Sequence, residues 1–419
     1  MNRWIRLSAA ILAMIMVGNL QYAWTLFVPP IVSSTGWKLS DVQWGFTFFV
    51  ALETWAMPLA GWFIDRYGPR VFIIMSGVLC GAGWSLMGQA HTLPHLYLLY
   101  STVGLGVAFV YCGSIGVALK WFPDKRGLAS GLIAAGYGSG ATIFNPLFAY
   151  ILHATDYRTT FLWTGIVEGL AILAAGLMLR NPPKGAVPVA VPAKAKVRSH
   201  SEDFTPWEML RTPQFYILYL MMLMVSIGGL MATAQVAPVA RNFKVGAAVL
   251  AVALSLDAAF NGTGRIWWGW VSDHIGRERT MLAGFALQAV FLCAVVTVGR
   301  TGAVWFVLSM ALVYFTWGEI YVLFPAVLAD RFGARYSAAN YSFLYSTKGV
   351  SSILAGGLAA KLFERTGSWN DAFFGSAALA LASALAAVVL LKLPLPKKRV
   401  PAAATVPTAN LLRERGGAE

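Results

Sequence analysis

Two cationic side chains lie in the middle of long apolar stretches of the chain. Arg265 lies within AVLAVALSLDAAFNGTGRIWWGW, and Lys348 lies within ANYSFLYSTKGVSSILAGGL. A charge at the centre of a lipid bilayer costs about 2.5–3.5 kcal/mol on insertion scales. Because arginine presents a planar fork of donors and lysine a compact point charge, the pair suits the carboxylates of one small dianion. We therefore predict that Arg265 and Lys348 form a buried anion site rather than a purely structural charge network.

Acidic residues in the same apolar stretches could neutralise these cations. They are Glu53, Glu168, Asp257 and Glu319. Asp257, Asn261 and Arg265 recur every four residues and therefore share one helix face. Asp257 lies about 12 Å from Arg265 along a helix axis, too far for a direct contact. We expect Arg265 to have no acidic partner within its own helix, and an alternative in which Asp257 or Glu319 carries a proton stays open.

Aromatic and amide side chains occur near the middle of several of these stretches. Their polar tips can donate hydrogen bonds to carboxylate oxygens, and their rings can narrow a cavity. In a chain with 16 Trp, 15 Tyr and 25 Phe, each one taken singly is more often a packing or interface residue. As a set, we predict that they line the anion site: Gln21, Tyr22, Gln43, Tyr111, Tyr137, Asn261, Trp317 and Tyr321.

The elements that must position these residues are membrane-spanning helices. The 419 residues are 58% hydrophobic and only 12% charged, whereas soluble domains are about 25% charged. Apolar runs of about 20 residues, the length that crosses the hydrocarbon core, recur along the chain. We predict an all-α integral membrane protein with twelve transmembrane helices, at about 5–27, 41–63, 71–90, 94–119, 128–152, 159–180, 214–238, 247–270, 279–299, 303–329, 337–361 and 370–393.

The two halves of the chain repeat a motif. GWFIDRYG at 61–68 recurs as GWVSDHIG at 269–276. Two six-helix halves in parallel repeat are typical of transporters that hold their substrate at the midplane between the halves. A stretch rich in Pro, Ala and Lys separates the halves and indicates a flexible linker. The predicted division is an N-terminal half at 1–180, a cytoplasmic linker at 181–213, a C-terminal half at 214–393 and a cytoplasmic tail at 394–419.

The repeated motif places carboxylates and arginines at helix ends. Asp65 and Asp273 can pair with arginines or cap neighbouring helices, and so latch the halves in one state. Simple anchoring in the cytoplasm would explain the arginines, but not the repeated Gly-x-x-x-Asp-x-x-Gly. We therefore predict a gating role for Asp65, Arg66, Arg70, Asp273 and Arg277.

The net charge of +14 follows membrane topology. Most Lys and Arg fall in segments that lie on one side if both termini are cytoplasmic, as the positive-inside rule requires. The positive charge therefore reflects insertion into a lipid bilayer rather than binding to nucleic acid. No metal-ligand, nucleotide-binding or Ser-His-Asp pattern stands out. We expect no metal, no cofactor, no enzyme activity and a functional monomer.

Several segments resemble a known family. GWFIDRYGPR and GWVSDHIGRER resemble the signature loops of the major facilitator superfamily. Nearly end to end, the chain resembles its oxalate/formate antiporter family, most distinctively in WFPDKRGLASG (121–131) and MLRTPQF (209–215). The resemblance implies electrogenic exchange of oxalate for formate across a bacterial inner membrane. It also implies that Arg265 and Lys348 bind the carboxylates and that the aromatic and amide set lines the site.

One residue departs from the resemblance. Glu319 stands where the family implies a small residue. On a helix Glu319 points about 200° away from Trp317, so we expect it to face a neighbouring span. We further expect the empty site to hold both cations unpaired, which would make exchange obligatory. The alternatives are a proton-coupled carrier of a monocarboxylate such as lactate or formate and, more remotely, an anion-sensing membrane receptor.

Overall fold

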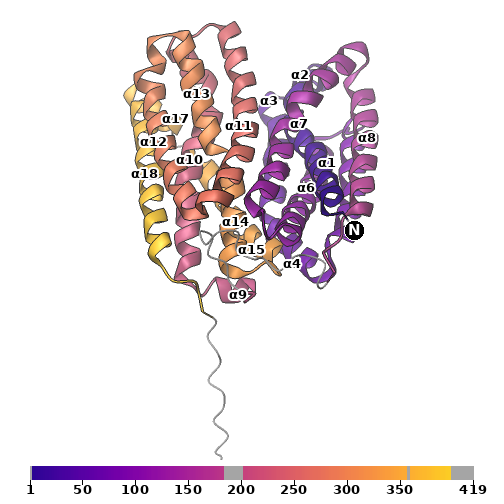
Figure 1. The fold of residues 1–419 in the computed structure, drawn as a ribbon. Coiled ribbons are helices and arrows are strands. Elements are labelled where there is room, and N and C mark those ends of the chain that lie inside the picture. Colours follow the sequence, from indigo (N-terminus) through magenta and orange to yellow (C-terminus); the bar gives the residue numbers. More distant parts are fainter. Residues whose placement is uncertain (1, 184–201, 356–358, 398–419) are drawn as a thin grey trace, which may run out of the picture.

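The computed structural model describes residues 2–183, 202–355 and 359–397. Helices make up the regular structure of these residues, which contain no strand. The helices form two groups in chain order that stand side by side (Figure 1). The proposed linker and tail fall largely outside the described residues, so the domain boundaries stay a prediction.

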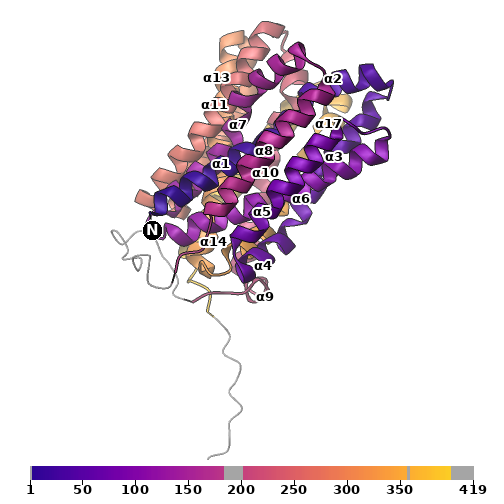
Figure 2. The ribbon, with the colours of Figure 1, turned by 90° about the vertical axis from the view of Figure 1, so that its right-hand side faces the viewer.

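The first group contains eight helices that pack mainly against one another. Helices α1, α5, α6 and α8 pack side by side within it (Figure 2). The bounds are α1 Arg3–Tyr22, α2 Trp24–Thr35, α3 Leu39–Trp55, α4 Met57–Tyr67, α5 Pro69–Met87, α6 Leu93–Trp121, α7 Arg126–Ala154 and α8 Tyr157–Met178.

The second group begins after a short helix, α9 Pro206–Met209. Helices α10, α12 and α18 pack together within it, and α11 packs on α13. The bounds are α10 Pro213–Asn242, α11 Ala247–Ile275, α12 Arg277–Thr297, η1 Gly299–Thr301, α13 Ala303–Trp317, α14 Ile320–Phe332, α15 Ser337–Tyr345, α16 Thr347–Ile353, α17 Ala359–Thr366 and α18 Asn370–Lys392.

The described residues of the predicted apolar runs fall mainly on helices. Within the described ranges, eight helices are long and apolar enough to cross a membrane, and a ninth span results if the bent pair α3 and α4 counts as one. The runs at 128–152, 247–270 and 337–361 correspond to α7, α11 and α15 to α17, which contain positions outside the described part of the structure.

Several predicted spans are broken near their middles. α3 and α4 meet at an angle of 43° next to Pro58, which lacks the backbone N–H that would continue the helix ladder. α13 gives way to α14 at Gly318 and Glu319, and α15 gives way to α16 at Ser346. Irregular backbone at membrane depth is tolerated where protein or a cavity covers it. These two breaks place Trp317 and Lys348 beside the cavity described below.

Small residues allow close helix packing in the first group. A Cβ atom on Gly81 of α5 would lie 2.9 Å from the Cα atom of Gly169, and one on Gly169 of α8 would lie 2.7 Å from the Cα atom of Gly81. Side chains at these positions would force the two backbones apart. Close approach through small residues is the usual way that helices pack in membranes.

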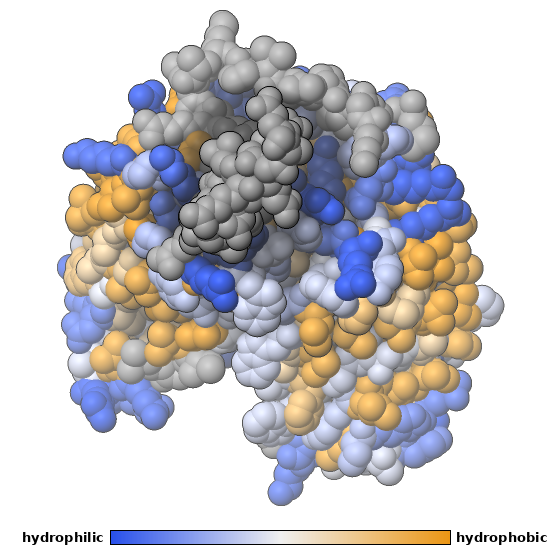
Figure 3. All heavy atoms as spheres, turned by 90° about the horizontal axis from the view of Figure 1, so that it is seen from below, coloured by the Kyte–Doolittle hydropathy of each residue, from blue (hydrophilic) through white to orange (hydrophobic). Residues whose placement is uncertain are grey.

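The two groups meet at the end of the molecule that carries the N-terminus, α4, α9 and α15 (Figure 1). We call this end the terminal face. Contacts between the groups run through α7 against α11 and through α4 against α15. Viewed onto the terminal face, hydrophilic residues are seen around the grey atoms, and apolar residues form broad patches along the flanks (Figure 3). Exposed apolar residues on the flanks are suited to contact with the hydrocarbon core of a lipid bilayer.

Candidate functional site: a cavity between the two groups of helices

A cavity of about 320 Å³ lies between the two groups of helices. This volume is at the small end of ligand pockets, about 300–1,000 Å³. Its walls combine aromatic rings with two cations and one carboxylate. The lining residues are Gln21, Tyr22, Tyr111, Tyr137 and Gly138 from the first group and Leu230, Thr233, Leu254, Asp257, Ala258, Asn261, Arg265, Tyr314, Trp317, Tyr321, Tyr345 and Lys348 from the second.

The structure brings the predicted lining residues together from distant parts of the sequence. Every member of the predicted set lines the cavity except Gln43, whose side chain lies outside the described part of the structure. Sequence reasoning missed Tyr314 and Tyr345. Each lies three residues before a predicted site residue, Trp317 or Lys348, so helical spacing could have identified both.

Arg265 is a buried cation without an ion pair among the described residues. Its side chain is buried, with 3% of the residue exposed. The guanidinium donates a hydrogen bond to the carbonyl of Ala134 on α7 and lies 4.7 Å from the ring centre of Tyr321. Among the described residues no carboxylate pairs with it, and its Nε has no partner. Gly138 leaves room for it, since a Cβ there would lie 3.3 Å from the guanidinium carbon.

Lys348 has an acidic partner, which corrects the expectation that both cations are unpaired. Its Nζ lies 3.6 Å from Oε1 of Glu53 and donates a hydrogen bond of 3.0 Å to the hydroxyl of Tyr345. Glu53 belongs to α3, and α3 packs against α16. A Cβ on Gly349 would lie 3.1 Å from Nε1 of Trp55, so these helices approach closely at this point. Sequence spacing shows partners within one helix, but not pairs between distant helices.

The Tyr137 hydroxyl joins Glu53 to the cavity wall. It lies 3.1 Å from Oε1 of Glu53 and within hydrogen-bonding reach of Oε1 of Gln21. Glu53 is fully buried, and its Oε2 has no hydrogen-bond partner among the described residues. One carboxylate oxygen of Glu53 is thus held by a cation and a phenol, while the other is unsatisfied.

The remaining buried acids lie in different surroundings. Asp257 lines the cavity at 3% exposure, and neither of its carboxylate oxygens has a hydrogen-bond partner in the described segments. Glu319 does not line the cavity and packs its carboxylate on Gly284 of α12, so it faces a neighbouring span as expected. Glu168 accepts a hydrogen bond from Asn19 within the first group. Asp257 is therefore the one carboxylate of these three that reaches the cavity.

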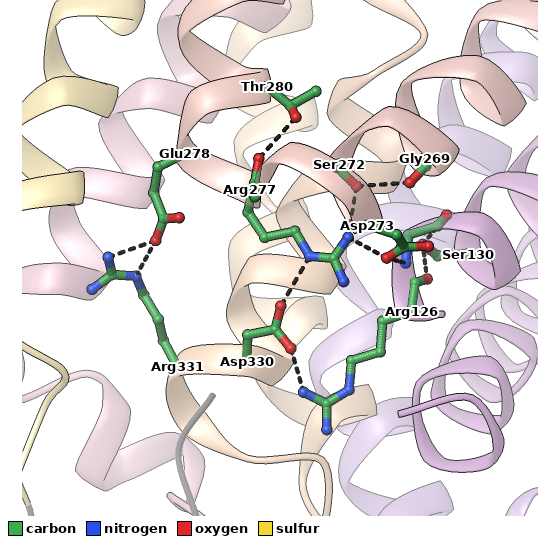
Figure 4. A network of polar contacts seen from close by, with 12 residues as sticks. Arg126, Ser130, Gly269, Ser272, Asp273, Arg277, Glu278, Thr280, Asp330 and Arg331 are labelled. Atoms are coloured by element: carbon green, nitrogen blue, oxygen red, sulfur yellow. Dashed lines mark hydrogen bonds and ion pairs between the residues drawn. The ribbon is translucent and has the colours of Figure 1, made fainter. Parts of the chain in front are cut away.

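A second polar cluster joins the groups at the terminal face (Figure 4). Asp273 accepts hydrogen bonds from the backbone N–H groups of Gly127 at 3.0 Å and Leu128 at 2.9 Å, at the start of α7. Asp330 of α14 pairs with Arg126 of α7 and, at 2.9 Å, with Arg277. An anionic side chain at a helix start satisfies free N–H groups and complements the helix dipole.

The first copy of the motif makes a matching contact. Asp65 accepts a hydrogen bond of 2.8 Å from the backbone N–H of Ala339, near the start of α15, and one of 2.6 Å from Lys120. Each motif aspartate therefore caps a helix of the opposite group. We call Asp65, Asp273 and Asp330, with their partners in the opposite group, the latch.

The predicted gating residues are only partly in the latch. Asp65 and Asp273 belong to the latch. Arg277 supports it through its ion pair with Asp330. Arg66 is exposed and lies over the rings of Trp62 and Tyr67. Arg70 forms no ion pair with the described residues. Sequence reasoning missed the partners Lys120, Arg126 and Asp330, which stand outside the repeated motif.

The profile of the Major Facilitator Superfamily matches residues 9–355 and 220–415. The chain belongs to this superfamily. The superfamily consists of membrane transporters, and the predicted all-α fold and family resemblance are confirmed by the comparisons below.

Among curated relatives of this superfamily member is the oxalate:formate antiporter of Oxalobacter formigenes. It is 39% identical over 400 residues, which are 95% of this chain and 94% of the relative. Monocarboxylate transporter 13 of Bos taurus is 24% identical over 93% of this chain and 89% of its own. A solved structure of the proton:xylose symporter XylE superposes with a TM-score of 0.70 at 12% identity, over 93% of this chain and 94% of that one. This last likeness concerns the fold alone.

Proposed function

We propose that this protein is a secondary active transporter that exchanges small carboxylate anions, oxalate against formate, by alternating access. The observation that carries the proposal is Arg265, a buried guanidinium in the cavity between the two groups with no carboxylate paired to it in the described residues. A buried cation without a counter-ion is unfavourable unless an anion meets it. The relative named as an oxalate:formate antiporter supports the choice of anions.

The lining residues provide the parts of such a site. The guanidinium fork of Arg265 binds one carboxylate in two hydrogen bonds. Nε1 of Trp317 is buried without a partner in the described structure, and it supplies a further donor. The phenols of Tyr111, Tyr137 and Tyr321 close the cavity around a small anion. Lys348 meets the second carboxylate of oxalate once it leaves Glu53.

The latch supplies the gate. In the conformation described, its contacts hold the terminal face closed. We assign this face to the cytoplasm of a bacterial inner membrane, with both termini there, and Asp65, Arg66, Arg70, Asp273 and Arg277 to the gate. A bound anion neutralises the cavity and allows the two groups to rock. Exchange of a dianion for a monoanion moves one net charge per cycle. We further propose that the protein functions as a monomer.

Labelled-oxalate uptake into proteoliposomes tests the proposal. Vesicles are preloaded with oxalate, formate, lactate or buffer alone, with and without a pH gradient. We expect uptake only into vesicles that contain oxalate or formate, stimulated by a membrane potential of the sign that favours net charge movement. Uptake into empty vesicles that depends on a proton gradient would contradict exchange.

A proton-coupled monocarboxylate carrier is the second candidate. The observation that favours it is Asp257, a buried carboxylate in the cavity with both oxygens unpartnered in the described segments. A proton on such a group removes the cost of a buried charge. Transporters named for monocarboxylates are among the relatives. Lactate uptake into empty vesicles, driven by an inward proton gradient and lost in Asp257→Asn, would establish this candidate.

A further inference from the structure

We propose that Glu53 is an internal counter-ion of Lys348 that competes with the second carboxylate of a substrate, and so sets how strongly the site prefers dicarboxylates over monocarboxylates. The inference rests on the proposed function in taking carboxylates as ligands, and it assigns a specificity-determining role to a residue that does not itself line the cavity.

The contacts of Glu53 show how it competes. Its Oε1 lies 3.6 Å from Nζ of Lys348. Lys348 also lines the cavity, and its Nζ donates a hydrogen bond to the hydroxyl of Tyr345. Glu53 is fully buried, so its charge is not screened by water. A ligand carboxylate that approaches Lys348 from the cavity must therefore displace Glu53 or share the ammonium with it.

Displacement leaves Glu53 poorly satisfied. Without Lys348, Glu53 keeps the Tyr137 hydroxyl at 3.1 Å, and its Oε2 has no partner among the described residues. A buried charge that loses its partner is strongly destabilising. The binding of a dicarboxylate is thus weakened by the cost of releasing Glu53, whereas a monocarboxylate on Arg265 leaves the pair of Glu53 and Lys348 intact.

The two substrates of an exchanger then use the site differently. A monocarboxylate such as formate is bound by Arg265 alone, with Lys348 already neutralised. When oxalate binds, one of its carboxylates must take the place of the Glu53 carboxylate beside Lys348. Return of Glu53 to Lys348 helps oxalate to leave, because the empty cavity then holds one unpaired cation instead of two.

Glu53→Gln tests the role without changing the shape of the side chain. Dissociation constants for oxalate and formate are measured by calorimetry on purified protein in detergent, together with Lys348→Gln, the double variant and Glu319→Gln. Glu319→Gln is the matched control, since it neutralises an equally buried glutamate that lies away from the cavity. Melting temperatures show whether each variant is folded, and Glu53→Asp, which keeps the charge, provides a second variant.

We expect the ratio of oxalate affinity to formate affinity to rise at least tenfold in Glu53→Gln and to stay within about twofold in Glu319→Gln and Glu53→Asp. In the Lys348→Gln background, Glu53→Gln should leave the ratio unchanged, because there is no ammonium left to compete for. An unchanged ratio in folded Glu53→Gln would overturn the proposal. An equal rise with and without Lys348 would also overturn it, since Glu53 would then act only through its general field.

The outcome is distinguishable from failure of the proposed function. If the wild-type protein binds formate but not oxalate, oxalate exchange is wrong, yet gain of oxalate binding in Glu53→Gln still supports the competition. If the wild-type protein exchanges oxalate and Glu53→Gln has the wild-type ratio, the proposed function stands and the role of Glu53 falls. If neither protein binds either anion, both proposals fail.

Discussion

Asp330→Asn should open the terminal face. Asp330 joins Arg126 of the first group to Arg277 of the second, and its side chain is only 4% exposed. The substitution keeps the shape of the side chain but removes the charge. Arg277 retains Asp273, whereas Arg126 has no other acidic partner in the described structure. The substitution therefore mainly weakens the contact between the two groups, because it removes the ion pair of Arg126.

The size of the effect follows from the burial of Arg126. Its side chain is 8% exposed in the closed conformation. Removal of one partner from a buried ion pair costs about 3–5 kcal/mol. Separation of the groups exposes Arg126 to water, so most of this cost applies to the closed state alone. A shift of about 3 kcal/mol changes the ratio of closed to open states by about 100-fold, since each 1.4 kcal/mol is tenfold.

Cysteine labelling measures the opening. Ser130 is fully buried beside the latch, and its hydroxyl lies 3.4 Å from the carbonyl of Val322 in the other group. Ser130→Cys is a small change, and the thiol should react with a maleimide only when the terminal face opens. We expect the labelling rate to rise at least tenfold when Asp330→Asn is added, after subtraction of the signal from the three native cysteines.

Glu278→Gln is the matched control. Glu278 forms a buried ion pair of 2.7 Å with Arg331, but both residues belong to the second group. Its loss should lower the melting temperature without increasing the labelling of Ser130→Cys. Equal labelling in both variants would show general loosening, and no increase in Asp330→Asn would refute the assignment of this ion pair to the gate.

Three further substitutions test the cavity. Arg265→Lys should weaken oxalate binding about 10- to 100-fold at equal charge, because one charge-assisted hydrogen bond worth about 1.5–3 kcal/mol is lost; oxalate affinity within about threefold of wild type would contradict the bidentate site. Asp257→Asn should strengthen anion binding, since one negative charge leaves the cavity, and should preserve exchange in vesicles; loss of transport would assign Asp257 to proton transfer. Gly229→Ala should lower the melting temperature and weaken oxalate binding, because its Cβ would overlap the Trp317 ring; Gly375→Ala, where a Cβ meets nothing within 4 Å, is the control, and equal effects would refute the packing argument.

Periodicity within one helix explains which site residues could be predicted. Asp257, Asn261 and Arg265 share a face because a helix repeats about every four residues, and all three line the cavity. The same periodicity predicted that Glu319 points away from Trp317. It could not show the breaks at Gly318 and Ser346, because apolar runs identify the length of a span rather than its continuity.

The amino-acid sequence by itself determined that the chain is a helical membrane protein with two buried cations, because hydrophobic run length and the cost of a buried charge are local properties. The repeated motif likewise identified Asp65 and Asp273, but not the residues that they contact. Only the tertiary structure decided that Glu53 pairs with Lys348 while Arg265 stays unpaired with any described carboxylate. Pairing between distant helices depends on how they pack, and packing is set by contacts such as Gly349 against Trp55 that no local pattern records.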